Sequence, residues 1–264
     1  MDTGLKDAKA LVLASSGGLG LAIGQELLSE GASVMLSSRD SERLEAAAAT
    51  MRTAAGSGDR VFAATADVSE PDSISRLFEY VRSTFGGLDI LVCNAGGPPA
   101  GGFGAVDDET WEFGFRLSVM SVVRSVRAAI PLMRNRPAPS ILVVGSSSVK
   151  RPIPNLLLSN VYRPAVRALV TDISADLASD GIRINMLCPG RMHTSRVDAL
   201  DHARAEREGK SLDTIRSSAV SAIPLKRLGH PSEFARAAVF LLGTSGSYIT
   251  GSTVMIDGGA VRVL

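Results

Sequence analysis

The strongest chemical signal in the sequence is a glycine-rich turn at residues 14–20, which reads ASSGGLG. It follows an apolar run at residues 10–14 and precedes a helical pattern at residues 19–30. Glycines in such a turn let backbone amides approach a pyrophosphate at the N-terminus of the helix. The strand–turn–helix context favours a dinucleotide site, and the alternative is a turn that is merely tight.

A second signal lies after the next apolar run, residues 33–37, where Ser38 and Arg39 follow. An acid that binds the ribose of NAD is expected about 20 residues after the glycines, and neither position holds a carboxylate. A serine and an arginine suit a 2′-phosphate, so the sequence favours NADP(H) over NAD(H). The alternative is that Arg39 only caps a helix that begins at Asp40 or Ser41.

Short apolar runs alternate with longer amphipathic stretches along the chain. We expect strands at residues 10–14, 33–37, 61–66, 90–93, 141–144, 183–187 and 253–256. We expect helices at residues 19–30, 41–55, 73–84, 111–133, 158–178 and 233–242. Apolar runs separated by helices are typical of a parallel sheet covered on both faces. The sequence therefore predicts one α/β domain over residues 1–264, a doubly wound parallel sheet (Rossmann fold) of about seven strands.

The predicted sheet also indicates where a ligand would bind. Ligands in such sheets bind beyond the carboxyl ends of the strands. The longest polar interruption, residues 191–222, follows the sixth apolar run at that end. Insertions of this length are often functional lids, and we predict a substrate lid here.

Composition excludes several classes of protein. The chain is 45% apolar and 21% charged, and its formal net charge is +1. These values disfavour disorder and a nucleic-acid partner, and no apolar run approaches the ~18 residues of a membrane span. Cys93 and Cys188 fit no metal spacing, and the histidines do not cluster, so no metal site is predicted. Reduced cysteines and an N-terminus without a leader pattern favour the cytoplasm.

These features resemble the short-chain dehydrogenase/reductase family over nearly the whole chain. The family's Thr-Gly-x-x-x-Gly-x-Gly turn matches residues 13–20, with Ala14 in place of the first glycine. Its adenine-contacting acid, its Asn-Ala-Gly, its Pro-Gly-x-x-x-Thr and its Asp-Gly-Gly match residues 67–68, 94–96, 189–194 and 257–259. The resemblance implies cofactor contacts at Ser15, Ser16, Gly18, Leu19, Gly20, Ser38, Arg39, Asp67, Val68, Asn94, Ala95, Gly96, Arg163, Pro189, Gly190 and Thr194.

The family's catalytic tetrad of Asn, Ser, Tyr and Lys is altered in this chain. By alignment with the family, Ser118, Ser146, Ser159 and Arg163 take these four places in turn. A serine hydroxyl is a much weaker acid than a tyrosine, and an arginine supplies positive charge without releasing a proton. Ser159 and Arg163 are spaced to share one helix face. We therefore expect the geometry of the site to be kept while its acidity is reduced.

Three further assignments have two interpretations each. Tyr162 is either a substitute proton donor or a packing residue. Lys150 and Arg151 either face the substrate or point to solvent. Ser146 is our main candidate to donate a hydrogen bond to the substrate oxygen, and the alternative is that it only satisfies nearby backbone.

The leading functional hypothesis is an enzyme that transfers a hydride between NADP(H) and the carbonyl or alcohol of a small molecule. By resemblance, the nearest type is a 3-oxoacyl-carrier-protein reductase, although the fold hosts many substrates. The alternative is a nucleotide-binding homologue with little or no turnover, which serves regulation or assembly. A non-redox relative similar to the halohydrin dehalogenases is disfavoured, because the tyrosine of their Ser-Tyr-Arg triad is missing.

The resemblance also implies a homotetramer. Family members of this kind associate through two long helices, here predicted at residues 111–133 and 158–178, and through the last strand. The C-terminal residues 260–264 are apolar enough to pack against a neighbouring subunit. No nucleic-acid or membrane partner is expected.

Overall fold

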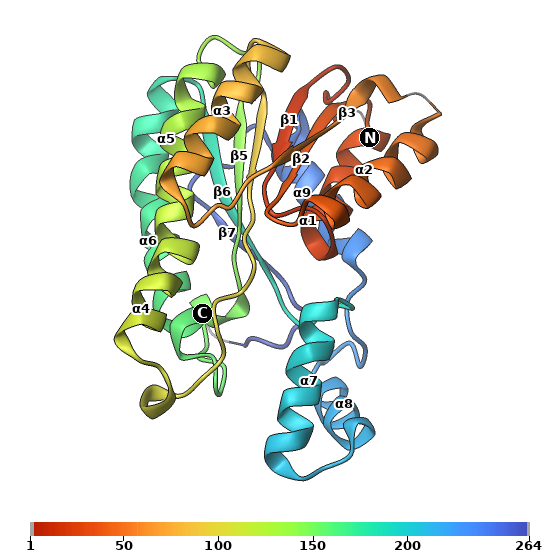
Figure 1. Ribbon diagram of the computed structural model, residues 1–264, viewed down its shortest axis with the longest axis vertical. Coiled ribbons are helices and arrows are strands. Elements are labelled where there is room, and N and C mark those ends of the chain that lie inside the picture. The colour runs from red at the N-terminus through yellow and green to blue at the C-terminus, as the bar shows by residue number, and fades with distance from the viewer. Residues whose placement is uncertain (1–2, 57, 263–264) are drawn as a thin grey trace.

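The computed structural model describes residues 3–56 and 58–262, which fold around one parallel sheet. Its strands are β1 (Lys9–Val12), β2 (Ser33–Ser38), β3 (Val61–Thr65), β4 (Ile90–Cys93), β5 (Ser140–Val144), β6 (Arg183–Pro189) and β7 (Thr253–Ile256). They lie in the order β3-β2-β1-β4-β5-β6-β7, and every pairing is parallel. The strand order reverses at β1, so the predicted doubly wound sheet is confirmed (Figure 1).

Helices cover both faces of the sheet. They are α1 (Gly18–Ser29), α2 (Ser41–Ala55), α3 (Pro71–Phe85), α4 (Asp108–Phe115), α5 (Ser121–Met133), α6 (Leu157–Ser179), α7 (Ser195–Glu208), α8 (Leu212–Ser221) and α9 (Pro231–Leu242). One hydrophobic cluster joins the sheet to α3, α5 and α6, and a second joins it to α1, α2 and α9. Leu11 of β1 belongs to the first cluster and Val12 to the second. The strands are therefore buried on both faces, which explains their continuous apolar character.

Strand register brings the functional loops to one edge. Val12 pairs with Leu36 and Val92, so the glycine turn begins level with the ends of β2 and β4. β5 and β6 pair up to Val144 and Leu187 at the same edge. The segments that carry the predicted site therefore leave the sheet side by side.

Three segments differ from the predicted elements. β1 ends at Val12 rather than at residue 14, because Ala14 turns the chain with a positive φ of 47°. The predicted helix 111–133 consists of α4 and α5 joined by a π-helical turn, Arg116–Met120. Residues 191–222 contain α7 and α8, which the hydropathy pattern does not predict and which project beyond the sheet in Figure 1.

The class of protein depends on whether the described residues include membrane-spanning helices, metal-binding groups or disulfides. None of their helices is long and apolar enough to cross a membrane. Within the same residues, no group of three His, Cys, Asp or Glu could hold a metal ion. Cys93 and Cys188 are buried free thiols, and burial raises their pKa values to about 12 and about 11. The sequence-based statements on residues 1–2 and 263–264 fall outside the described residues.

Candidate active site

The glycine turn is held against the end of β4. Asn94 Nδ2 donates a hydrogen bond of 2.9 Å to the Ala14 carbonyl. A Cβ atom placed on Gly20 would lie 2.7 Å from that amide nitrogen and 2.9 Å from the same carbonyl, so only glycine fits. Gly17, at the N-cap of α1, makes no side-chain cap. The first amides of α1 are thus presented as an anion site requires.

Serine hydroxyls link the glycine turn to the end of β2. Ser15 Oγ donates to the Val12 carbonyl at 2.7 Å and accepts from the Ser37 amide at 3.0 Å, which fixes the turn. Ser16 Oγ and Ser38 Oγ are 2.9 Å apart. The structure therefore brings together two residues that sequence analysis assigned to the cofactor from separate loops.

Two arginines flank this serine pair, of which sequence analysis identified one. Arg39 is exposed directly after β2. Arg43 Nη2 reaches the turn and lies 3.7 Å from a Cβ atom placed on Gly17. Arg43 lies in the first turn of α2, four residues after Arg39, and no sequence signal pointed to it.

The predicted adenine side is built at the end of β3. Asp67 Oδ1 accepts hydrogen bonds from the amide and hydroxyl of Ser69, at 2.8 and 2.7 Å. The Ala66 amide donates to the Ser38 carbonyl at 2.9 Å, which places Asp67 and the buried Val68 beside the end of β2. Asn94, Ala95 and Gly96 follow β4 on the other side of the glycine turn.

Three serines occupy the end of β5 and the start of α6. Ser146 is partly exposed, and its Oγ accepts a hydrogen bond of 3.2 Å from the Ser148 amide. Ser159 is buried, and its Oγ is 3.1 Å from Ser148 Oγ. Ser148 thus stands next to the two serines that sequence analysis proposed. The run of three serines after β5 signals this region, but only the fold shows which hydroxyl meets Ser159.

Arg163 is buried beside these serines. Its side chain is 6% exposed, and Nη1 donates to the Val144 carbonyl at 3.2 Å. Burial lowers the pKa of Arg163, while neighbouring Cys188 raises it and neighbouring Arg196 lowers it. The guanidinium nevertheless keeps its proton, because its unperturbed pKa exceeds 12. A fixed positive charge therefore sits at the end of β5.

The remaining candidates for catalysis are Ser118, Tyr162, Lys150 and Arg151. Ser118, in the π-helical turn, is buried, and its Oγ has no hydrogen-bond partner among the described residues. Tyr162 Oη donates to the Trp111 carbonyl at 2.9 Å, and its ring packs edge-on against Trp111. The structure thus engages the Tyr162 hydroxyl with α4 and does not bring it to Ser159. Lys150 and Arg151 lie in the turn before α6, partly exposed and exposed respectively.

The loop after β6 closes the site from the opposite side. A Cβ atom on Gly190 would lie 2.7 Å from Asp257 Cα, so glycine lets this loop pack on the end of β7. Thr194 caps α7 by accepting from the Val197 amide, and its Cγ2 lies 3.9 Å from a Cβ atom placed on Gly18. The predicted carboxamide-binding residue thus stands next to the glycine turn.

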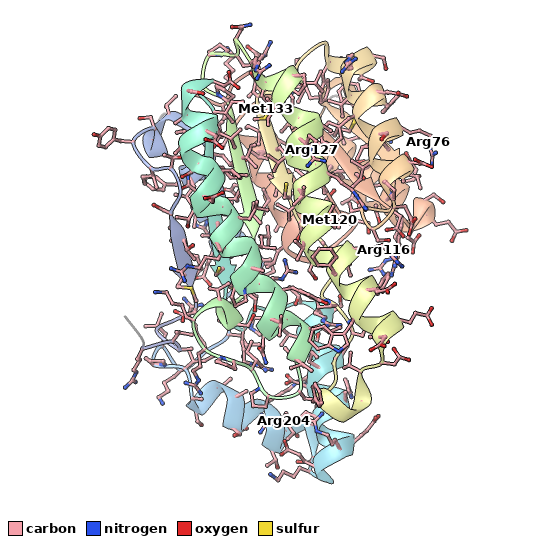
Figure 2. The ribbon with its side chains drawn as sticks, turned by 90° about the vertical axis from the view of Figure 1, so that its left-hand side faces the viewer. Arg76, Arg116, Met120, Arg127, Met133 and Arg204 are labelled. Atoms are coloured by element: carbon pink, nitrogen blue, oxygen red, sulfur yellow. The ribbon has the colours of Figure 1, made fainter. Side chains whose placement is uncertain are left out.

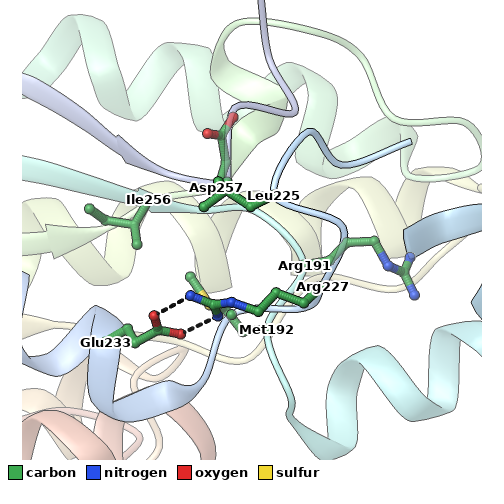
Figure 3. Close-up of a pocket in the computed structure, with 9 residues that line it drawn as sticks. Arg191, Met192, Leu225, Arg227, Glu233, Ile256 and Asp257 are labelled. Carbon is green, nitrogen blue, oxygen red and sulfur yellow. Dashed lines mark hydrogen bonds and ion pairs between the residues drawn. The ribbon is translucent and has the colours of Figure 1, made fainter. Parts of the chain in front are cut away.

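A separate pocket of about 100 Å³ lies behind this loop (Figure 3). It is lined by Arg191, Met192, Leu225, Arg227, Gly229, Glu233, Ile256, Asp257 and Gly258. Arg227 and Glu233 form a double hydrogen-bonded ion pair, which lowers the pKa of Glu233 to about 2. No residue proposed for the cofactor or catalysis lines this pocket.

Comparison with known sequences finds likeness over almost the whole chain. A family model described as enoyl-(acyl carrier protein) reductase matches residues 13–261. Dehydrogenase/reductase SDR family member 4 from Sus scrofa is 35% identical over 265 residues, which cover 98% of this chain and 89% of that protein.

Solved structures show the same likeness in three dimensions. L-sorbose reductase from Gluconobacter frateurii, complexed with NADPH and L-sorbose, matches with a TM-score of 0.94 and 32% identity, over 100% of both chains. An NADPH-bound short-chain oxidoreductase from Pseudomonas aeruginosa PAO1, described as containing an atypical catalytic centre, matches with a TM-score of 0.88 and 32% identity. That match covers 97% of this chain and 98% of the other.

The backbone of Ala14 generates a prediction about stability. A non-glycine residue in the left-handed region costs about 1–3 kcal/mol, and glycine costs about 0.5–1 kcal/mol in unfolded-state entropy. We expect Ala14→Gly to raise the free energy of unfolding by about 1 kcal/mol, as measured by urea denaturation. Ala49→Gly, inside α2, should lower it by a similar amount. Destabilisation by both changes would show that Ala14 is not strained.

Proposed function

Because the chain belongs to the short-chain dehydrogenase/reductase family and is an NAD(P)-dependent oxidoreductase, we propose that it uses NADP(H) to reduce the carbonyl of a small molecule. The observation that carries this proposal is the buried Arg163 guanidinium, bonded to the Val144 carbonyl two residues before Ser146. It puts positive charge beside a partly exposed hydroxyl at the carboxyl edge of the sheet. A carbonyl oxygen that becomes an alkoxide needs both a hydrogen bond and positive charge.

The preference for NADP(H) is supported by the end of β2. Ser16 and Ser38 face each other there, Arg39 is exposed directly after β2, and Arg43 reaches Gly17 of the turn. Hydroxyls and guanidinium groups suit a 2′-phosphate, whereas NAD-specific sites place a carboxylate near the ribose. The relatives from Gluconobacter frateurii and Pseudomonas aeruginosa were both solved with NADPH.

In this proposal the dinucleotide supplies the hydride, which goes to the carbonyl carbon of the substrate. Ser146 donates a hydrogen bond to the carbonyl oxygen, and Arg163 holds the nicotinamide ribose and stabilises the developing negative charge. The proton that completes the alcohol comes from solvent through a hydroxyl, because Arg163 cannot release one. Ser159, paired with Ser148, holds a water molecule or a substrate group. We propose α7 and α8 as the lid that covers the substrate.

A second candidate is a nucleotide-binding protein with little turnover, in a regulatory or assembly role. One observation favours it: the Ser159 hydroxyl is bonded to Ser148, and the nearest tyrosine in sequence, Tyr162, is bonded to Trp111. The site therefore lacks a strong acid at the position where the family has its tyrosine. This candidate predicts tight NADPH binding with slow reduction of every carbonyl compound tested.

We also propose that a 3-oxoacyl-type compound be among the first substrates tested. We propose a cytoplasmic location, which the two buried free thiols support.

The assembly that we propose is a homotetramer. Figure 2 shows α5 and α6 side by side on one face, with Arg127 and Met120 along α5 and the turn before it. Val161 is exposed on α6, Phe115 at the end of α4, Phe240 on α9, and Tyr248 in the segment before β7.

The first prediction concerns the 2′-phosphate. Charge-assisted bonds are worth about 1.5–3 kcal/mol, so NADPH should bind at least about tenfold tighter than NADH. Arg39→Ala should remove most of this difference in a fluorescence titration. Arg236→Ala, an exposed arginine bonded within α9, should leave it unchanged. Equal affinities of the wild type for NADPH and NADH would refute the assignment.

The second prediction concerns the altered tetrad. The double variant Ser159→Tyr/Arg163→Lys restores the family's pair, and one well-placed donor is typically worth about 10²–10³ in rate. We expect it to raise kcat/KM on simple ketones at least about tenfold, with NADPH affinity unchanged within a few-fold. Tyr162→Phe should not alter kcat, because its hydroxyl bonds the Trp111 carbonyl. Fast wild-type turnover that collapses in the double variant would show that serine and arginine work as they stand.

The third prediction concerns assembly. Light scattering at micromolar concentration should give the mass of four chains rather than 27.6 kDa. A charge introduced at the exposed Val161, as Val161→Glu, should shift the mass toward smaller species. A monomer in the wild type would contradict the proposed tetramer.

A further inference from the structure

Arg196 connects helix α7 to the loop that follows β4. It lies in the first turn of α7, two residues after Thr194. Its Nη2 donates to the Pro98 carbonyl at 2.9 Å, and its guanidinium atoms lie 2.9–3.1 Å from a Cβ atom placed on Gly97. The side chain thus crosses from the start of the proposed lid to the loop that follows β4. That loop leaves β4 next to the end of β5, the strand that leads to Ser146.

The charge of Arg196 has no carboxylate partner among residues 3–56 and 58–262, and neither has the charge of Arg163. Other arginines in and next to the lid behave differently. Ion pairs join Arg191 to Asp201, Arg204 to Glu208, Arg216 to Asp198 and Arg227 to Glu233. Arg207, exposed on α7, also has no carboxylate partner among these residues, so what distinguishes Arg196 is that its unpaired guanidinium is bonded to the loop after β4.

The two unpaired guanidinium groups act on each other. Arg196 is exposed, yet the protein around its guanidinium displaces some of its hydration and lowers its pKa, and the charge of Arg196 contributes to the lowered pKa of Arg163. Arg163 is more than nine-tenths buried and has one hydrogen bond, to Val144, for its five N–H groups. Two positive charges that act on each other, neither with a carboxylate partner among the described residues, favour the binding of an anion.

Resting on the proposed function, we propose that Arg196 binds a carboxylate of the substrate, so that the preferred substrate is an oxo acid. One N–H of Arg196 donates to the Pro98 carbonyl and holds the side chain in place. The remaining N–H groups are then available to donate hydrogen bonds to a carboxylate. A carboxylate held there sets the neighbouring carbonyl over Ser146 and Arg163.

The test compares acids with their neutral esters in the full-length protein. NADPH oxidation is measured with acetoacetate and methyl acetoacetate, and with pyruvate and methyl pyruvate. We expect kcat/KM to favour at least one acid over its ester by tenfold or more. Arg196→Met should remove this preference by lowering the acid's kcat/KM about tenfold to a hundredfold relative to the ester's. Arg207→Met, an exposed arginine of the same helix, is the matched control.

Two binding measurements separate the possible failures. Calorimetry of acetoacetate and pyruvate with the NADP⁺ complex should show binding of at least one of them that Arg196→Met weakens tenfold, even where turnover is slow. A fluorescence titration should show unchanged NADPH affinity in Arg196→Met. Absence of NADPH binding in the wild type overturns the proposed function and this inference together.

The remaining outcomes overturn the inference alone. In one such outcome NADPH binds normally, acids and their esters give the same kcat/KM, and Arg196→Met has no effect. This result would show that Arg196 only holds α7 against the Pro98 loop. Weaker NADPH binding in Arg196→Met shows that the guanidinium serves the phosphates of the dinucleotide instead.

Discussion

The burial of the Arg163 charge is the constraint on which the catalytic half of this protein depends. A guanidinium removed from water without a carboxylate costs several kcal/mol, and one hydrogen bond to Val144 offsets only part of this. The surroundings are built to hold it in place. Gly145 allows β5 to pack against Cys188, where a Cβ atom would lie 2.5 Å from Sγ, and α6 carries Arg163 and Ser159 on one face. Such costs persist at functional sites because the bound state uses them.

The cofactor half of the site follows from a different kind of constraint, which is backbone geometry. Gly18 and Gly20 provide the conformation and the close approach that the turn requires, and Asn94 fastens the turn to β4. Ala14 adopts the same left-handed backbone at a residue type that resists it. The glycine turn meets the loop after β6 where Thr194 lies beside Gly18. The start of α7, the proposed lid, therefore lies against the glycine turn.

Much of this arrangement could be predicted from the sequence, for physical reasons. Strands buried on both faces are continuously apolar, and parallel register brings their carboxyl ends to one edge, so the sheet and its cleft follow from hydropathy alone. Ser38 was identified by its place after the second predicted strand, and Ser16 by the glycine turn that the chain shares with the family. Side-chain directions are set by tertiary packing, however, and the roles of Arg43, Ser148 and Arg196 had no signal of comparable strength. The π-helical turn at Ser118 and the two helices of residues 191–222 also depend on packing that hydropathy does not record.

The central claim is that the buried charge of Arg163 lowers stability and is retained to bind the dinucleotide. The most direct measurement pairs the thermal midpoint of the ligand-free protein with its NADPH affinity, in Arg163→Met and in Arg167→Met, an exposed arginine one turn further along α6. We predict that Arg163→Met raises the midpoint, because a buried charge becomes an apolar side chain of similar length, and weakens NADPH binding at least about tenfold. Arg167→Met should change neither quantity. A lower midpoint together with unchanged NADPH affinity in Arg163→Met would contradict the account and make Arg163 a structural residue.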